Sequence, residues 1–505
     1  MAGDIASFGR LTGALWVLIR ADALLPEPLD PYLPPSARVL AKAVRLLRGG
    51  KARRGRPGER LAGALETLGP AAIKLGQLLS TRADIFGEPF AEDLARLKDQ
   101  LAPFPLDQAK AQVVKALGQP LEALFSAFGP AIAAASLAQA HPATLIDGRK
   151  VAVKVLRPGI EAQVRADIAA LILAGRLAER LGATARRLEP RALTAAVARS
   201  LELELDLRLE AAGASELGEV MARDPYMRAP QVVWDGVAKR VLTLAWAEGE
   251  PLSSPAALEQ EGLDRPALAV QLTRAFLAQA LDHGVFHADL HEGNLFAAAP
   301  DKLMAVDFGI LGRLGHAERR YLAEILWGFI ERDYLRVAKV HFRAGYVPER
   351  HSVEAFAQAI RAVGEPIFGH HAGEVSMGRV LTQLFEITAL FDMRLRPELV
   401  LLQKTMVTVE GVARRIDPAH DIWAAADPVV RRWIMRELSP ASRLKRLADE
   451  GLDILETLVH RLETPPAPLP PAVEPSRRGS RAGWFALGMA VAGLAAAIAA
   501  VWGRT

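Results

Sequence analysis

The feature that most constrains the fold of this 505-residue chain lies between residues 287 and 309. The segment HADLHEGN places Asp289 and Asn294 in one loop, and the tripeptide DFG begins thirteen residues after Asn294, at Asp307. The four residues before Asp307 (LMAV) are all apolar, as in a short buried strand. A tripeptide such as DFG alone occurs by chance in many chains. Loop, spacing and strand together are a specific signal that few folds accommodate.

This segment fits the protein-kinase catalytic-loop pattern H-x-D-L-x-x-x-N followed by D-F-G. Phosphoryl transfer needs a carboxylate near the acceptor, which predicts that Asp289 is the catalytic residue. It also needs oxygen ligands for magnesium, and the pattern predicts Asn294 and Asp307 in that role. The expected cofactors are therefore ATP and Mg²⁺. The expected fold class is α+β, an atypical protein-kinase-like fold with two lobes.

A lysine upstream supports the same interpretation. The segment VAVKV around Lys154 resembles the kinase strand whose lysine holds the α- and β-phosphates. An Asp-Gly pair at Asp147 and Gly148, the usual signal of a tight hairpin, lies between the strand-like segments 137–145 and 151–156. A lysine in an apolar strand can also extend from a sheet edge into solvent. With the downstream loops present, we predict that Lys154 binds ATP.

The loop that should cover the phosphates departs from the ordinary kinase pattern, because the chain contains no G-x-G-x-x-G. Its place is taken by IAAASLAQA, residues 132–140. Alanine carries a Cβ, so such a loop cannot adopt positive φ freely or approach phosphates as closely as glycine does. A plain Ala-rich turn of helix is the alternative interpretation. We predict an ATP-binding loop formed by Ile132, Ala133, Ala134, Ala135, Ser136, Leu137, Ala138, Gln139 and Ala140.

Two segments have ambiguous or long helical patterns. Residues 59–101 show helical periodicity, with Lys74, Gln77 and Thr81 on one face, which predicts helix. The segment LELELDLRLE, residues 201–210, alternates with period two as a strand does. It consists of helix formers without a β-branched residue, so we predict one helix in which Glu204 pairs with Arg208.

The two ends of the chain predict contact with a membrane. Apolar residues at near-helical spacing in residues 1–30 predict an amphipathic helix, lying on a membrane or on the protein itself. Arg20 interrupts that segment and disfavours a cleaved signal peptide. A Pro/Arg-rich linker, residues 464–482, is followed by twenty uncharged residues, 483–502, with a tryptophan at each end. These predict a C-terminal transmembrane helix, with the catalytic part in the cytoplasm because arginines precede the span.

Six segments in order along the chain resemble the UbiB family of atypical kinases and ATPases of ubiquinone biosynthesis. They are KLGQLLSTR, the Ala-rich loop, VAVKVLRP, ELDLRLEAA, HADLHEGN and DFG. The segment 394–418, RLRPELVLLQKTMVTVEGVARRIDP, also resembles the family's C-lobe. The resemblance covers roughly residues 5–460, and the family uses an Ala-rich loop in place of the Gly-rich one.

The resemblance implies further residue roles. Lys154 would pair with Glu210, which would then belong to the ATP site, whereas spacing alone left Glu161 and Glu179 open. An N-terminal helical extension would fold over the active site, with Lys74 facing two acidic residues. The implied regulatory residues are Lys74, Gly76, Gln77, Glu204 and Asp206. In the catalytic loop, Leu290 and Glu292 stand where family members often have proline.

The resemblance and the residues together predict six parts. They are an amphipathic helix at 1–30, a helical extension with the KxGQ motif at 31–120, an N-lobe with a helical insertion at 121–255, a helical C-lobe at 256–463, the linker at 464–482 and the membrane span at 483–502.

Two features of ordinary protein kinases are absent from this sequence, and their absence limits the class of molecule expected to accept the phosphoryl group. Ala288 replaces the kinase arginine of H-R-D, and only about eight residues separate Asp307 from a helix expected near His316. No A-P-E follows, so a peptide substrate is not expected to dock in the ordinary way. A small molecule, a lipid or water is the expected acceptor.

The expected function is that of a membrane-anchored atypical kinase or ATPase, required for or regulating ubiquinone biosynthesis at the bacterial inner membrane. Its expected partners are membrane lipid and ubiquinone precursors or biosynthetic enzymes, without nucleic acid, and a homodimer remains open. The alternative is an ATP-dependent scaffold of the biosynthetic enzymes. A polyprenylphenol hydroxylase is disfavoured, because the chain has no cysteine, no dinucleotide fingerprint and no Glu-x-x-His pair.

Overall fold

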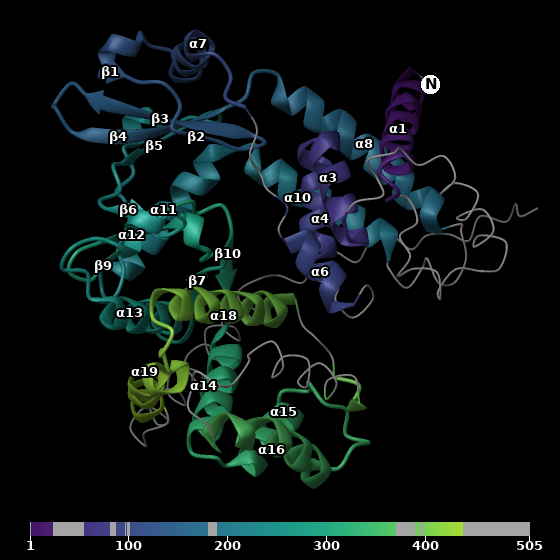
Figure 1. Ribbon diagram of the computed structural model, residues 1–505, viewed down its shortest axis with the longest axis vertical. Coiled ribbons are helices and arrows are strands. Elements are labelled where there is room, and N and C mark those ends of the chain that lie inside the picture. The colour runs from purple at the N-terminus through teal and green to yellow at the C-terminus, as the bar shows by residue number, and fades with distance from the viewer. Residues whose placement is uncertain are drawn as a thin grey trace, which may run out of the picture. The chain divides into compact units, whose positions relative to one another are not determined.

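The computed structural model describes residues 2–23, 55–80, 87–95, 97, 102–179, 189–369, 387, 390–393 and 397–437. Its smaller lobe is built on an antiparallel sheet in the order β1-β3-β4-β5, with the short strand β2 paired to β3 (Figure 1). The strands are β1 (Phe125–Phe128), β2 (Ala133–Ala134), β3 (Ala138–Leu145), β4 (Lys150–Leu156) and β5 (Val241–Ala245).

The predicted hairpin between β3 and β4 is confirmed. Gly148 has φ +87°, which a glycine adopts without strain, and the backbone N–H of Arg149 donates to the carboxylate of Asp147. This turn sets the register that pairs Lys154 with Ala140 on one side, and β5 pairs Leu242 with Lys154 on the other.

The alternation along β4 decides which side chains reach the site. Val151, Val153 and Val155 are buried on one face, against helix α7 (Leu106–Leu117). Because successive side chains in a strand point to opposite faces, Lys154 projects to the other face. That face is covered by a second core in which Leu156 and Leu242 pack against α8 (Ile160–Ala178), α10 (Pro190–Glu204) and α11 (Leu207–Met221).

The single helix predicted for residues 201–210 is wrong. Helix α10 ends at Glu204 and α11 begins at Leu207. Asp206 lies between them in an extended conformation, and its carboxylate accepts from the backbone N–H of Arg208. An aspartate at an N-cap satisfies the free N–H groups of a new helix, which outweighs the helix propensity of its neighbours. Arg208 consequently pairs with Asp206 at 2.6 Å.

In the described part of residues 59–101 the predicted helical structure is present, as several helices rather than one. Gly69 has φ +97° and is followed by Pro70, which ends α3 (Pro57–Leu68) and starts α4 (Pro70–Leu79). Helix α6 (Glu88–Ala95) completes this cluster around the buried Leu65 and Leu94.

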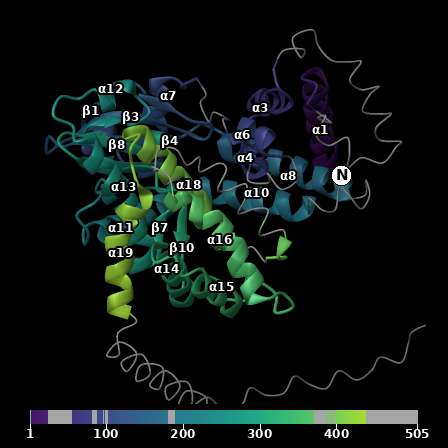
Figure 2. The same ribbon diagram turned by 60° about the horizontal axis from the view of Figure 1, so that its bottom comes forward.

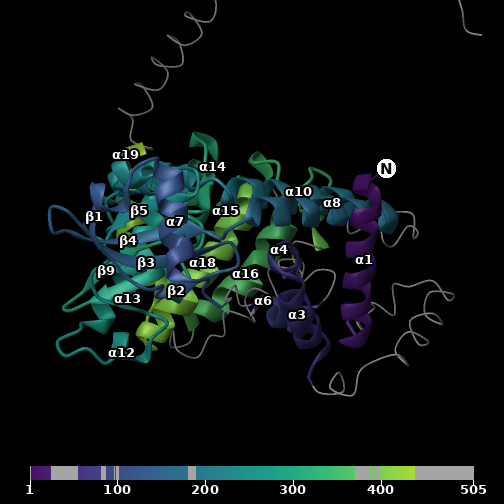
Figure 3. The ribbon, with the colours of Figure 1, turned by 90° about the horizontal axis from the view of Figure 1, so that it is seen from above.

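The first helix, α1 (Ala2–Arg20), lies on the protein itself. Arg10 forms an ion pair with Asp167 of α8, and Leu18 packs on the core of the N-terminal extension. Figure 3 shows α1 crossing beside one end of α8. Of the two surfaces considered for this helix, the structure therefore shows contact with α8 and α3.

The larger lobe is mainly helical. Helix α13 (Arg265–Ala278) packs along α18 (Pro397–Ile416), as Figures 1 and 2 show. This lobe also contains short strands, and loops of the candidate site connect several of them. The strands are β6 (Glu250–Pro251), β7 (Val285–His287), β8 (Leu295–Ala298), β9 (Lys302–Ala305) and β10 (Leu311–Arg313). Other helices among the described residues are α12 (Pro255–Leu258), α14 (His316–Ile330), α15 (Tyr334–Arg343), α16 (Val353–Gly369) and α19 (Ile422–Glu437).

The predicted fold class requires a correction at the C-terminus. A helix needs about 20 consecutive apolar residues to cross a bilayer. Within the described ranges, no helix is both long enough and apolar enough to do so. The segment 483–502 lies outside those ranges, as does the linker 464–482. The transmembrane helix is therefore removed from the fold class, and the structure supports its α+β part.

Candidate functional site

Lys154 joins three elements at the junction of the two lobes. Its Nζ donates to both carboxylate oxygens of Glu210 on α11, at 2.7 and 2.9 Å. The same Nζ lies 3.4 Å from Oδ2 of Asp307, in the loop after β9. The expected Lys154–Glu210 pair is therefore present. The two alternatives form ion pairs elsewhere, Glu161 with Arg240 and Glu179 with Arg191.

The three charges strongly influence one another. Burial opposes the charged form of Lys154, but Asp307 and Glu210 outweigh it and raise the pKa of the ammonium above its usual range. Lys154 in turn holds the pKa of Asp307 below its ordinary value. Burial raises the pKa of Glu210 to about 7, against the opposing effect of Lys154. At neutral pH the site thus presents a firmly charged lysine beside an ionised, solvent-accessible Asp307.

His287 connects the catalytic loop to the segment that carries Asp307. His287 is the last residue of β7, its ring is buried, and Nδ1 accepts from the backbone N–H of Asp289 at 3.1 Å. Nε2 therefore carries the proton and donates to the carbonyl of Val306 at 3.3 Å. Burial lowers the pKa of His287, which keeps the ring neutral, and its two hydrogen bonds select this tautomer. One side chain thus sets the position of Asp289 relative to Asp307.

Asn294 and Asp307 fit a magnesium site of the kind completed by nucleotide phosphates. The amide nitrogen of Asn294 donates to the carbonyl of Asp289 at 3.0 Å, so its Oδ1 is the atom suited to a cation. Asp307 has φ +63°, uncommon for a residue with a side chain, and its carboxylate is about half exposed. Mg²⁺ commonly takes one or two protein oxygens and fills its remaining positions with water and phosphate. The described residues contain no cluster of three or more His, Asp or Glu that would make a separate metal site.

Helix α18 supports the catalytic loop where family members often have proline. Leu290 is fully buried, and Glu292 forms an ion pair with Arg415 of α18. The hydroxyl of Thr405, also on α18, lies 3.1 Å from the carbonyl oxygen of Ala288 and 2.8 Å from that of Leu401, and its one hydrogen is shared between them. Contacts from a distant helix thus restrain the loop, and sequence patterns gave no signal for Arg415 or Thr405.

The Ala-rich segment forms a tight β2–β3 hairpin, so the alternative of a helical turn is excluded. Ala133 pairs with Ala140, and the N–H of Ala135 donates to the carbonyl of Ala138 at 2.8 Å. No residue of 132–140 has positive φ, in agreement with the expected effect of alanine. Gln139 is buried and bonded to Phe104, so it would contribute to ATP binding through its backbone rather than its side chain.

Of the predicted regulatory residues, the structure brings Lys74 and Glu204 into contact. Lys74 on α4 forms an ion pair with Glu204 at the end of α10. Asp206 caps α11 and pairs with Arg208, as described above, so the contact that the structure gives for Lys74 is the one with Glu204. Gly76 is closely packed, because a Cβ there would lie 2.3 Å from Cδ1 of Leu97 and 2.6 Å from Cδ1 of Leu65, so both leucine side chains would have to shift. Gln77, on the same helix, is half-buried.

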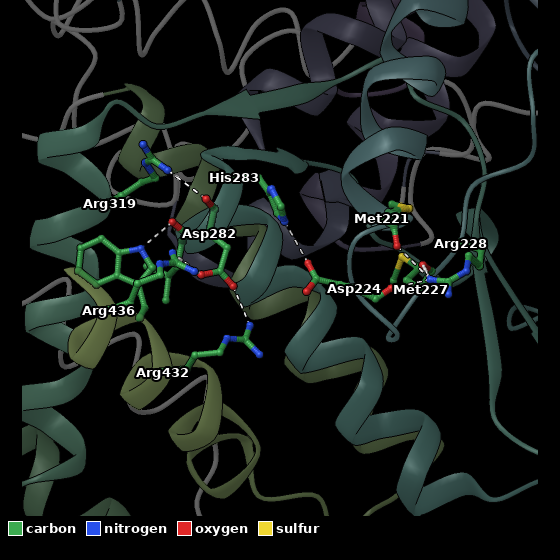
Figure 4. A network of polar contacts seen from close by, with 11 residues as sticks. Met221, Asp224, Met227, Arg228, Asp282, His283, Arg319, Arg432 and Arg436 are labelled. Atoms are coloured by element: carbon green, nitrogen blue, oxygen red, sulfur yellow. Dashed lines mark hydrogen bonds and ion pairs between the residues drawn. The ribbon is translucent and has the colours of Figure 1, made fainter. Parts of the chain in front are cut away.

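Polar contacts connect the C-terminal end of α11 to the larger lobe (Figure 4), and Glu210 lies in the first turn of the same helix. Arg228 donates to the carbonyls of Met221 and Met227, at 2.9 and 3.0 Å, and so caps the helix. Asp224 lies 3.1 Å from Nε2 of His283, in the π-helical turn Gln279–His283. The neighbouring Asp282 in turn pairs with Arg432 and Arg436 of α19, as Figure 4 also shows.

Replacing Gly213 by alanine is expected to loosen the site. A Cβ at Gly213 would lie 3.0 Å from the carbonyl oxygen of Phe308, so α11 and the loop beside Asp307 must separate slightly. We expect about 1–2 kcal/mol of destabilisation from this crowding, with a severalfold loss of Mg-ATP affinity. Urea denaturation and nucleotide titration measure the two effects.

Gly218→Ala in the same helix is the matched control, because its Cβ would meet only an ordinary contact at 3.8 Å. Removing a helical glycine there is expected to stabilise by about 0.5–1 kcal/mol. Equal stabilisation by both alanines would show that the approach of α11 to Phe308 is not tight.

Comparisons with known proteins agree with this geometry. The model of the ABC1 atypical kinase-like domain matches residues 96–341, and that of the UbiB helical domain matches residues 360–421. A protein of Marinobacter nauticus named "Probable protein kinase UbiB" is 41% identical over 395 residues, covering 77% of this chain and 72% of its own. A protein of the same name from Pseudomonas aeruginosa is 39% identical over 445 residues, covering 85% and 82%.

One solved structure reports on the fold alone. The complex of Rv3197 with erythromycin, from Mycobacterium tuberculosis, superposes with a TM-score of 0.50 at 24% identity. The match covers 78% of this chain and 97% of that one.

Proposed function

The chain belongs to the UbiB family of atypical kinase-like proteins, and we propose that it binds Mg-ATP and transfers or hydrolyses its γ-phosphate in support of ubiquinone biosynthesis. The observation that carries this proposal is the position of Lys154 between Glu210 and Asp307. The segment of Asp307 is bonded to the loop of Asp289 and Asn294, because the N–H of Val306 donates to the carbonyl of Asn294. A lysine, a Mg²⁺-binding Asp/Asn pair and a separate carboxylate are the parts that phosphoryl transfer requires.

Each residue has a defined task in this proposal. Lys154 holds the α- and β-phosphates, and Glu210 keeps its ammonium aimed at them. Oδ1 of Asn294 and the carboxylate of Asp307 hold Mg²⁺, which when bound neutralises charge on the phosphates. Asp289 accepts the proton of the attacking hydroxyl or water. The Ala-rich hairpin covers the phosphates with its backbone.

The acceptor is proposed to be small or a lipid, such as a ubiquinone precursor, or water. The chain after Asp307 returns at once to the larger lobe, because β10 pairs with β7 and aligns Leu311 with His287. Helix α14 then begins at His316. The short segment leaves little backbone on which an extended peptide would dock.

The test is nucleotide binding and phosphate release by the purified full-length chain with Mg-ATP, with and without a ubiquinone-like lipid. Lys154→Met is expected to weaken Mg-ATP binding by at least about tenfold, the equivalent of roughly 1.4 kcal/mol from one lost charged contact. Lys150→Met is the control, because Lys150 lies exposed on the same strand. Wild-type chain that binds no Mg-ATP, or equal binding by both variants, would refute the proposal. Labelled phosphate recovered in the lipid would identify a kinase, and phosphate released only to water an ATPase.

A further inference from the structure

The Ala-rich hairpin is restrained by a polar clamp that connects it to residues 102–104. Arg157, just beyond β4, donates from Nε to the carbonyl of Ala135 at 2.9 Å and from Nη1 to the carbonyl of Ala102 at 3.0 Å. Its guanidinium carbon also lies 5.8 Å from the ring centre of Phe104. One planar cation thus spans the hairpin turn and the segment that enters α7.

Gln139 completes the clamp from β3. Its Oε1 accepts from the backbone N–H of Phe104 at 2.8 Å, and its Nε2 donates to the carbonyl of Phe104 at 3.2 Å. The amide therefore bonds both polar groups of one residue, as a neighbouring strand would. Its second Nε2 hydrogen points at Nε2 of the buried His141, at 2.8 Å.

The tautomer of His141 lets its ring accept the second hydrogen bond from the amide of Gln139. Nδ1 of the ring lies 2.9 Å from the carbonyl of Gly129 and so carries the proton, which leaves Nε2 to accept from Gln139. Burial lowers the pKa of His141 and keeps the ring neutral. A satisfied buried network of this kind holds one geometry, because any displacement leaves a polar group without its partner.

We propose that Arg157 and Gln139 are positioning residues that hold the Ala-rich hairpin in the place from which its backbone covers the nucleotide phosphates. This deepens the proposed function and rests on it. The hairpin contains no glycine, and the clamp restricts its peptide planes further. Arg157 holds the carbonyl of Ala135. The peptide bond between Ala135 and Ser136 is trans, so the N–H of Ser136 points away from Arg157. Loops that meet phosphate with backbone N–H groups require such fixed planes.

The test compares Arg157→Lys, Arg157→Met and Gln139→Glu with wild type in the full-length chain. Lysine retains a charge but cannot reach two carbonyls with a planar fork. Glutamate at 139 retains the acceptor for Phe104 and loses both donors. Arg149→Met is the control, because Arg149 is an exposed arginine in the turn between β3 and β4, where it pairs with Asp147.

Two readouts separate positioning from general stability. Without nucleotide, amide hydrogen exchange of residues 132–140 is expected to accelerate by about tenfold in Arg157→Met and Gln139→Glu, with β4 and β5 unchanged. The dissociation constant of Mg-ATP is expected to increase from wild type to Arg157→Lys and again to Arg157→Met. The increase over the whole series is expected to be about fivefold to tenfold. Arg149→Met is expected to match wild type in both.

The outcomes distinguish the two proposals. Unchanged exchange in the hairpin would overturn the clamp, and changed exchange with unchanged Mg-ATP affinity would overturn its role in positioning. Wild-type chain that binds no Mg-ATP would overturn the proposed function, while the exchange result would still decide whether Arg157 and Gln139 hold the hairpin. If Arg157→Met does not fold, Arg157→Lys and Gln139→Glu decide both points.

Discussion

Asp307→Asn is expected to abolish magnesium-dependent nucleotide binding. The carboxylate is the only anionic member of the proposed Mg²⁺ pair, and Mg²⁺ strongly prefers charged oxygen ligands. Asparagine has the same size and keeps one oxygen, so the change removes charge with little effect on packing. We expect the Mg-ATP dissociation constant to rise by at least about 100-fold, the equivalent of roughly 2.7 kcal/mol. Thermal stabilisation by Mg-ATP should disappear with it.

Without nucleotide, Asp307→Asn is expected to fold as the wild type does. A loss of Mg-ATP binding can then be attributed to the missing carboxylate. The side chain of Asp307 is about half exposed, and Lys154 retains its two contacts with Glu210. Asp235→Asn is the matched control, since Asp235 is an exposed aspartate of the smaller lobe, in the turn Trp234–Gly236. If Mg-ATP still raised the melting temperature of Asp307→Asn as it does that of Asp235→Asn, the assignment of the metal site would be wrong.

In some parts of the fold, neighbouring residues alone decide the local structure. There the sequence contains the necessary signal, both where our prediction was right and where it was wrong. The Asp147-Gly148 pair predicted the hairpin because an Asp-Gly turn matches the twist of the strands around it. The helix across 201–210 failed for a similar, local reason: Asp206 prefers to cap a helix rather than continue one. The break at Gly69 followed by Pro70 was also readable, since this pair marks helix ends.

For the site, sequence could predict the residues of the motifs but not their supports. Lys154, Asp289, Asn294 and Asp307 stand in recognisable patterns, although their roles stay predictions until nucleotide binding is measured. The supports come from positions far away in the chain, as with Thr405, which bonds Ala288 from 117 residues further on. No periodicity or spacing specifies such a partner, because it depends on how whole helices pack.

The buried Gln139 illustrates the same limit within a motif. Its place in the Ala-rich segment predicted a contact with nucleotide, whereas the structure turns its amide toward Phe104. A polar side chain in a strand can face either side, and burial on one side becomes favourable only when partners for its hydrogen bonds are present there. Phe104 lies 35 residues earlier, outside any local pattern.

Asp289→Asn is expected to stop turnover while leaving nucleotide binding intact. The carboxylate is about one-third exposed and is not among the groups that Lys154 contacts, so ATP and Mg²⁺ should bind as in wild type. The backbone N–H that Asp289 donates to His287 is unaffected by the change, and the loop should keep its conformation. Loss of the proton acceptor is expected to lower the rate of phosphate release at saturating Mg-ATP by about 100- to 10,000-fold.

The comparison of Asp289→Asn with Asp307→Asn separates chemistry from binding. The first should lose the rate at unchanged Mg-ATP affinity, and the second should lose affinity itself, because one carboxylate serves the acceptor and the other the metal. The measurements are phosphate release at saturating Mg-ATP and the dissociation constant from direct titration, with Asp235→Asn as the control for both. A rate within twofold of wild type for Asp289→Asn would show that the acceptor's proton leaves by another route, and the role of this loop would have to be reassigned.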